Sequence, residues 1–131
     1  MTQTTTTNVV DRANRTAEDI ANILAEATVA AQLAVSEAVI DYKEKYPDDA
    51  YGEPMYCGFA WVNIYGIKAS TKEGRAMKQA GLKKDYSGAF SIWNPGNHAG
   101  QSMDFKEVGA YAYAKVLEVY GYRAYAGSRA D

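Results

Sequence analysis

The sequence predicts an α+β fold: a long N-terminal helix followed by a small three-stranded sheet with two helices packed on it. Apolar residues recur every three or four positions over the first third of the chain, which is typical of a helix that buries one face. Later stretches alternate as half-buried strands do, and between them lie segments with helix-capping residues and a terminal glycine. At 131 residues, one domain is expected. We predict a disordered threonine-rich tail over residues 1–12 and a single ligand-binding domain over residues 13–131.

The long helix is expected within residues 13–46. Thr16 can cap it together with Asp19, Pro47 ends it, and its apolar stripe comprises Ile20, Ile23, Leu24, Ala27, Ala31, Ala34, Ala38 and Tyr42. Such a helix spans about 45 Å, whereas a domain of this size has a radius of gyration of about 14 Å. We therefore expect part of it to pack on another subunit. A break into two helices near residues 34–37 is the alternative, because most helices are shorter.

The rest of the chain alternates between strands and helices. The first strand lies in YCGFAWVNIY, residues 56–65, with Gly58, Ala60, Val62 and Ile64 facing the helices and Phe59, Trp61 and Asn63 facing a partner or ligand. A short helix follows, with Ser70 as its cap and Gly81 after its end. The second strand is predicted over residues 86–93, the third helix over about residues 104–120 with Asp104 as its cap, and the last strand in residues 122–131.

Composition argues against several classes of protein. The net charge of −2 and the pI near 5.4 disfavour a protein that grips long nucleic acid by neutralising phosphates. A single cysteine, Cys57, cannot form an internal disulfide and fits a reducing cytoplasm. The N-terminus lacks the features of a signal peptide, and no uncharged apolar run reaches 18 residues. We therefore expect a cytoplasmic protein with no membrane partner.

Catalytic motifs are sparse. The chain has no phosphate-binding glycine loop and only one histidine, His98, so histidine-based metal sites and catalytic triads have little to build on. Asp48, Asp49 and Glu53 do not have the spacing of a calcium loop. Cys57 and His98 could form a nucleophile and a base, but a thiol within a strand is expected to be buried and inert. We predict a protein that is not an enzyme and has no cofactor or metal.

Two segments suggest a site for an anionic, planar ligand. The loop WNPGNHAGQSMD, residues 93–104, leads into a helix N-terminus, which favours anions. Its alternative role is an ordinary loop whose asparagines and glycines serve turns. Near the C-terminus, Arg123 and Arg129 frame Tyr125, and arginine both binds phosphate and stacks on rings. The alternative for Arg129 is an exposed ion pair with Asp131, which contributes little.

Four motifs together resemble a phage protein family: YCGFAWVNI, YSGAFSIWNP, NHAGQSMD and RAYAGSRAD. They are similar to the first-described phage Thoeris anti-defence sponges, which bind isomers of cyclic ADP-ribose made by bacterial TIR enzymes. The likeness covers about the C-terminal 75 residues. It implies a homo-oligomer, a dimer or an assembly of dimers, that buries the cyclic nucleotide at a subunit interface without chemistry, in the cytoplasm of an infected bacterium. Members of this family can also hold cyclic oligonucleotides at a separate site.

The predicted ligand-binding residues divide into three roles. Stacking is assigned to Phe59, Trp61 or Trp93 and phosphate binding to Arg123 and Arg129, while ribose and base edges are assigned to Asn63, Asn94, His98, Gln101 and Ser102. Three other functions remain open. One is a structural phage accessory protein whose aromatic face is filled by another subunit, and the second is a nucleotide-processing enzyme that uses Cys57 and His98. Single-strand nucleic-acid binding is the least favoured, given the acidic pI.

Overall fold

The computed structural model describes residues 12–131 and shows an α+β architecture. In chain order the elements are η1 (Arg12–Asn14), α2 (Ala17–Lys45), β1 (Gly58–Tyr65), α3 (Lys72–Gln79), β2 (Lys83–Lys84), β3 (Phe90–Trp93), α4 (Met103–Val119) and β4 (Arg123–Ala130). The strands form one antiparallel sheet in the order β2-β3-β1-β4.

The α+β class and the long N-terminal helix are confirmed. The prediction of three strands is wrong, because a lysine pair adds the short strand β2. The tail predicted over residues 1–12 lies outside the described residues, apart from Arg12.

Helix α2 is continuous over 29 residues, so the alternative of a break near residues 34–37 is wrong. Thr16 caps it as predicted: its hydroxyl accepts from the Asp19 backbone, and the Asp19 carboxylate accepts from the Thr16 backbone. The buried positions begin at Ile20 and end at Val35. The predicted stripe is therefore wrong beyond Ala31, because Ala34, Ala38 and Tyr42 are only half-buried. By length and composition α2 could cross a membrane, but a helix that buries one face in a protein core passes the same test.

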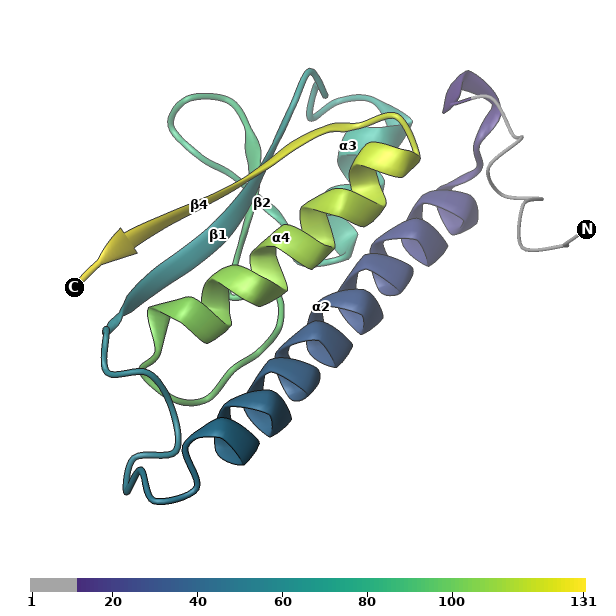
Figure 1. Ribbon diagram of the computed structural model, residues 1–131. Coiled ribbons are helices and arrows are strands. Elements are labelled where there is room, and N and C mark those ends of the chain that lie inside the picture. The colour runs from purple at the N-terminus through teal and green to yellow at the C-terminus, as the bar shows by residue number, and fades with distance from the viewer. Residues whose placement is uncertain (1–11) are drawn as a thin grey trace, which may run out of the picture.

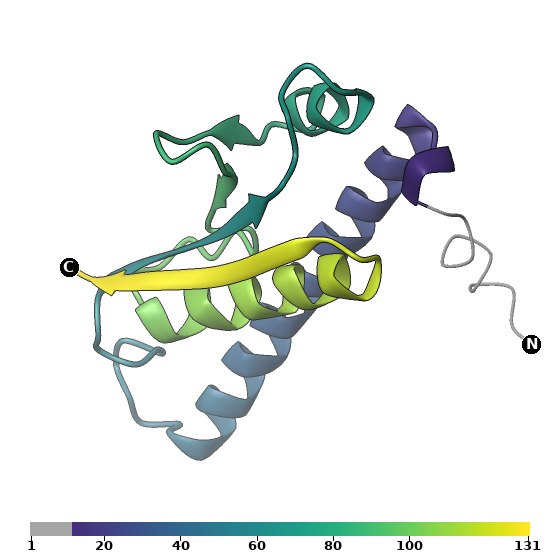
Figure 2. The same cartoon turned by 90° about the horizontal axis from the view of Figure 1, so that it is seen from above.

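The helices lie on one face of the sheet. Helix α4 packs directly on β1 and β4, whereas α2 packs on α4 and on α3. Figure 1 shows α2 and α4 side by side, and Figure 2 shows them on one side of β1 and β4. The expectation that two helices pack on the sheet is therefore corrected: α4 covers it, while α3 lies mainly against α2. The core between these layers contains Val62, Ile64, Phe90 and Leu117, all with no exposed surface.

Two helix starts and one strand differ from the prediction. Thr71, not Ser70, caps α3 by accepting from the Gly74 backbone at 3.1 Å. Ser102, not Asp104, caps α4 by accepting from the Phe105 backbone at 3.3 Å. The second strand begins four residues later than predicted, because Asp85 organises a turn in which it accepts from the backbone of Ser87 and Ala89. Both glycines predicted after helix ends, Gly81 and Gly121, do adopt left-handed φ angles of 98° and 92°.

The loop between β3 and α4 passes close to both long helices. A Cβ on Gly96 would lie 2.6 Å from a methyl carbon of Val35 and 3.2 Å from the Cα of Gly109. Asn94 and Asn97 have left-handed φ angles of 48° and 57°, a conformation that asparagine tolerates better than most residues. The glycine and asparagines of this loop therefore serve packing and turns, as the alternative interpretation held.

Candidate ligand-binding face

Strand β1 places its side chains as the alternation predicts. Gly58, Ala60, Val62 and Ile64 are buried toward the helices, while the intervening residues are exposed or half-buried. The cross-strand partners of this second set point to the same side of the sheet. We call the resulting surface, on the side away from α2 and α4, the open face. It comprises Phe59, Trp61, Asn63, Tyr65, Lys83, Ser91, Trp93, Arg123, Tyr125, Gly127 and Arg129.

An aromatic cluster occupies one end of the open face. Trp61 and Trp93 are cross-strand partners whose ring centroids lie 5.1 Å apart at 38°, and Phe59 meets Trp93 edge-on at 5.9 Å and 72°. A Cβ on Gly127 would lie 2.7 Å from the indole Nε1 of Trp61, so this indole lies directly over β4. Trp93 is 57% exposed. The cluster therefore offers a fixed aromatic platform with a free face, as stacking requires.

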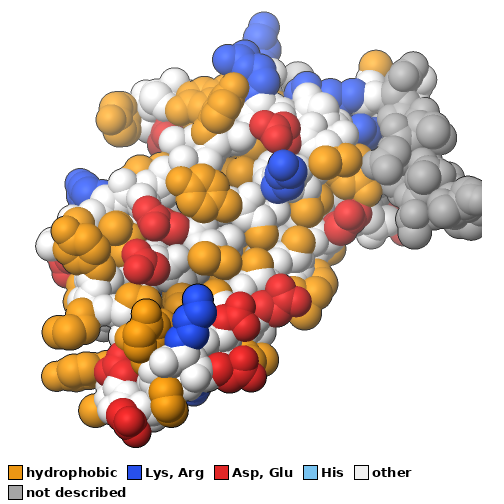
Figure 3. Space-filling model, in the orientation of Figure 1, with side chains coloured by type: hydrophobic (Ala, Val, Ile, Leu, Met, Phe, Trp, Pro, Cys, Tyr) orange, Lys and Arg blue, Asp and Glu red, His pale blue; other side chains and the backbone are white. Residues whose placement is uncertain are grey.

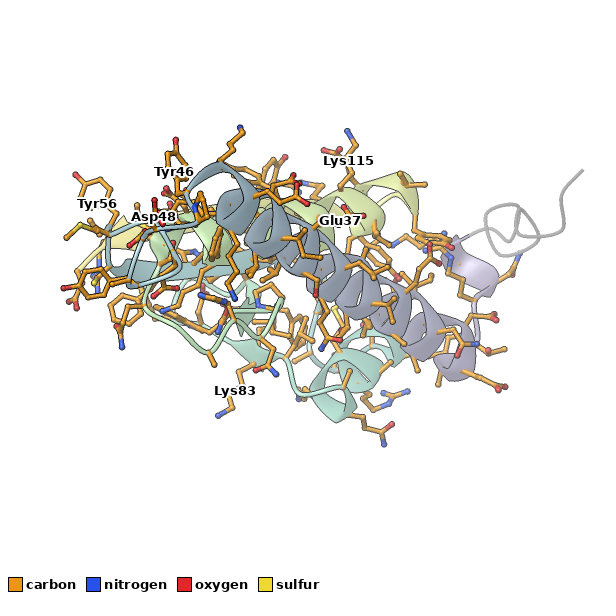
Figure 4. The ribbon with its side chains drawn as sticks, turned by 60° about the horizontal axis from the view of Figure 1, so that its bottom comes forward. Glu37, Tyr46, Asp48, Tyr56, Lys83 and Lys115 are labelled. Carbon is orange, nitrogen blue, oxygen red and sulfur yellow. The ribbon has the colours of Figure 1, made fainter. Side chains whose placement is uncertain are left out.

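A cavity of about 380 Å³ adjoins Trp93 and is also lined by Lys83, Ser91 and Asp85. Lys83 and Ser91 are cross-strand partners on the open face, and Figure 4 shows Lys83 on the side away from Glu37 of α2 and Lys115 of α4. The Asp85 carboxylate accepts from the Ser87 hydroxyl and from the backbone of its own turn, which holds its pKa below the usual value. Lys83 therefore places a cation beside an exposed indole. Lys83 was not among the predicted site residues, although the turn-forming residues 85–88 could have indicated a hairpin.

A second aromatic pair lies toward the other end of the open face. The rings of Tyr65 and Tyr125 are 5.9 Å apart at 53°, and Tyr125 is 56% exposed. Asn63 lies between the two aromatic groups, and its side-chain nitrogen lies 3.5 Å from the Tyr65 hydroxyl. The face thus combines two aromatic groups with an amide between them.

The two predicted arginines are both exposed on this face, but they lie at opposite ends. Arg129 is the cross-strand partner of Phe59, and Arg123 is that of Tyr65. Six residues of strand separate their Cα atoms by about 20 Å. The expectation that they frame a single anion site around Tyr125 is therefore corrected: each can meet its own anionic group. The cations that line the cavity at Trp93 are Lys83 and Lys84 and not an arginine, and the Lys84 ammonium donates to the carbonyls of Ile67 and Gly88.

Two of the predicted loop residues, Asn94 and His98, make their contacts within the protein and not with the open face. The Asn94 side chain donates to the His98 carbonyl at 2.9 Å and accepts from the His98 backbone at 3.3 Å. The His98 ring lies 2.7 Å from Glu53 through Nε2 and packs edge-on against Phe105. Burial raises the pKa of the Glu53 carboxyl, but hydrogen bonds from His98 and the Gln101 backbone outweigh this and hold it below the usual value. These contacts join the connector after α2 to the loop before α4.

The other two loop residues differ in exposure. Ser102 is buried, and its hydroxyl caps α4 by accepting from the Phe105 backbone, so it serves the helix and does not face a ligand. Gln101 is exposed, and its backbone bonds Gly58 and Glu53. His98 lines a cavity of about 650 Å³ under the end of α2. Figure 4 shows Tyr46, Asp48 and Tyr56 at that end of the molecule. The four loop residues therefore do not join the open face.

The side chains of the alternative catalytic pair have other partners: the Cys57 thiol lies 3.8 Å from the Met55 carbonyl, and His98 contacts Glu53. Cys57 is exposed, because β1 begins one residue later, so the expectation of a buried thiol is wrong. It lines a cavity of about 280 Å³ with Gln101, and Tyr51 and Glu53 line both this cavity and the one that His98 lines. Among residues 12–131, no group of three or more histidine, cysteine, aspartate or glutamate side chains could hold a metal ion.

Comparison of the chain with models of protein families, with curated proteins and with solved structures gives no match.

Proposed function

We propose that this protein binds a small cyclic nucleotide immune signal on the open face and sequesters it without degrading it. The observation that supports the proposal is the combination on one exposed sheet face of the Trp61–Trp93 platform with Lys83, Arg123 and Arg129. The resemblance to the phage Thoeris anti-defence sponges suggests an isomer of cyclic ADP-ribose as the ligand. On this reading the protein acts in the cytoplasm of an infected bacterium.

The chemistry of the face suits such a ligand. Stacking on an aromatic side chain contributes about 1–3 kcal/mol per base, and charge-assisted hydrogen bonds to phosphate are about twice as strong as neutral ones. Asn63 and Ser91, which are cross-strand partners in the middle of the face, can hydrogen-bond ribose and base edges. Because the net charge is −2, these cations act locally and do not attract long nucleic acid from a distance.

Titration calorimetry with the cyclic ADP-ribose isomers tests the proposal. Both tryptophans of the chain lie on the open face, so quenching of intrinsic fluorescence should accompany binding. Trp93→Ala should weaken binding about 5-fold to 100-fold, as loss of one stacking ring predicts. Tyr86→Ala is the matched control, because Tyr86 is fully exposed in the turn before β3.

Sequestration requires tight binding and slow release rather than turnover. Ligand recovered by heating the complex should therefore be chemically intact on chromatography. A cleaved product would show that the protein is an enzyme, and no binding of any isomer would reject the nucleotide proposal.

The second candidate is a structural accessory protein whose apolar surfaces contact other subunits. Val29, Leu33 and Ile40 support it, since they are 55–59% exposed on the side of α2 opposite its buried face. In Figure 3 hydrophobic and acidic side chains lie next to each other along the diagonal that α2 occupies in Figure 1. Light scattering tests it: under this alternative Leu33→Asp dissociates an oligomer, whereas under our proposal it leaves both the molar mass and the ligand affinity unchanged.

A further inference from the structure

The segment that carries α3 and β2 differs in charge from the rest of the chain. Residues 66–84 contain six lysines and arginines against one acid, Glu73, which gives a net charge of +5. The other residues hold eight basic and 15 acidic side chains, which gives a net charge of −7. The overall charge of −2 is therefore the sum of two regions of opposite sign.

The six basic side chains of this segment are all exposed. We call them the basic lobe: Lys68, Lys72, Arg75, Lys78, Lys83 and Lys84. None of them forms an ion pair within the described chain, and Glu73 is paired with Arg12, outside the segment, at 2.8 Å. In Figure 3 lysine and arginine side chains gather along the upper edge, where Figure 1 places α3. The charge of the lobe is thus directed at solvent and not neutralised by the protein.

The basic lobe lies beside the cavity at Trp93. Lys83, Lys84 and Gly81 line that cavity, and Gly81 is the second residue after α3. Lys78 lies three residues before Gly81, and Lys72 lies one and a half helical turns further back, about 9 Å along the axis. The α3 lysines are therefore at most about 20 Å from the cavity wall along the chain. This distance is shorter than the Debye length of about 30 Å at 0.01 M salt.

The two regions of charge act together on an approaching anion. The acidic remainder of the molecule repels it, while the basic lobe attracts it toward the side on which the cavity opens. A cleft beside charges of one sign raises the association rate of an oppositely charged ligand by about 10-fold to 1,000-fold. A neutral ligand gains nothing from this field.

We infer that the basic lobe steers a doubly charged anion, such as the diphosphate of a cyclic ADP-ribose isomer, to the cavity at Trp93. This inference rests on the nucleotide-binding function proposed above and adds to it a surface outside the binding site. The lobe selects ligands for negative charge through the rate of association, whereas the aromatic platform governs the rate of release. A protein that removes a signal by binding it benefits from fast capture as well as slow release.

Stopped-flow tryptophan quenching on the full chain measures both rates. The probe is the cyclic ADP-ribose isomer that binds most tightly in the calorimetric titration. The double variant Lys72→Glu/Lys78→Glu lowers the net charge of residues 66–84 from +5 to +1. At about 0.01 M salt it should lower the association rate constant about 3-fold to 10-fold and change the dissociation rate constant by less than about 2-fold. At about 0.5 M salt the two chains should associate at rates within about 2-fold of each other, because the Debye length is then about 4 Å.

A matched control places the same change of charge elsewhere. The double variant Lys45→Glu/Lys115→Glu alters two exposed lysines outside the basic lobe, at the end of α2 and on α4. Figure 4 shows Lys115 on the side away from Lys83. This variant should change the association rate constant by less than about 2-fold, since its charges are screened from the cavity by distance. Circular dichroism and thermal unfolding check that each variant is folded.

The salt dependence of the unmodified chain is a test that needs no variant. Its association rate constant should fall at least about 5-fold between 0.01 M and 0.5 M salt. If association does not depend on salt, or if both double variants slow it equally, the steering inference is wrong while the nucleotide-binding function stands. It is also wrong if Lys72→Glu/Lys78→Glu changes dissociation alone, because the lysines would then belong to the site itself. If no isomer binds, both proposals fail.

Discussion

The turn between α4 and β4 carries two buried tyrosines. Replacing each by phenylalanine should lower the free energy of unfolding at one position and not at the other. Tyr120 and Tyr122 are 7% and 3% exposed, and the buried guanidinium of Arg15 lies 5.5 Å from the centroid of each ring. The Tyr120 hydroxyl donates to Glu26 at 2.6 Å. The Tyr122 hydroxyl is buried and, within the described chain, has no hydrogen-bond partner. Burial raises its pKa, and the nearby Arg15 and Glu73 act on that pKa in opposite directions. Replacing each tyrosine by phenylalanine removes only the hydroxyl.

The magnitudes follow from these contacts. Tyr120→Phe loses a hydrogen bond to a charged acceptor, worth about 1.5–3 kcal/mol, and we expect the lower end because Glu26 remains exposed to water. Tyr122→Phe removes a buried, unpaired hydroxyl whose desolvation costs about 1–3 kcal/mol, so the free energy of unfolding should stay unchanged or rise by about 1 kcal/mol. The two variants should thus differ by at least about 1.5 kcal/mol, or about 6 °C in Tm for a chain of this size.

Urea unfolding followed by circular dichroism measures the difference by linear extrapolation. Tyr86→Phe is the matched control and should change nothing, since Tyr86 is fully exposed. A loss of more than about 1 kcal/mol in Tyr122→Phe would refute the reasoning, because it would mean that the hydroxyl has a partner in solution. Equal losses in the two variants would refute it as well.

Three further predictions concern other parts of the molecule. Gly96→Ala should lower the free energy of unfolding by about 1–3 kcal/mol, since the new methyl would lie 2.6 Å from Val35; an unchanged thermal midpoint would show that the loop gives way. The folded-state pKa of Glu53 lies below 4.5, so its contribution to stability is complete above that pH and is lost as the pH falls through the folded value. Urea unfolding at pH 7 and pH 3 should therefore show a smaller decrease for Glu53→Gln than for the unmodified chain, and equal decreases would contradict this. Gly127→Ala should displace the Trp61 indole, which a Cβ would approach to 2.7 Å, and should shift the tryptophan emission; an unchanged spectrum would contradict the packing described for the open face.

Several features of the molecule were determined by local sequence alone. The Thr16–Asp19 capping box, the buried stripe of α2 from Ile20 to Ala31 and the alternation of β1 were predicted correctly. These features depend on the helical period of 3.6, on the strand period of 2 and on side chains that bond their own backbone. All three act over a few residues and leave a direct pattern in the sequence.

Only the tertiary structure decided which of the predicted site residues share one surface. Strand register brought Trp61 next to Trp93 and added Lys83 to the face, and the extended conformation of β4 separated Arg123 from Arg129. Packing of the loop against α2 and α4 drew Asn94, His98 and Ser102 into structural contacts of their own. The physical reason is that the Trp61–Trp93 pair and the contact of Gly96 with Val35 join residues 30 or more positions apart. Such pairings are set by how whole elements fill the core and have no short-range pattern in the chain.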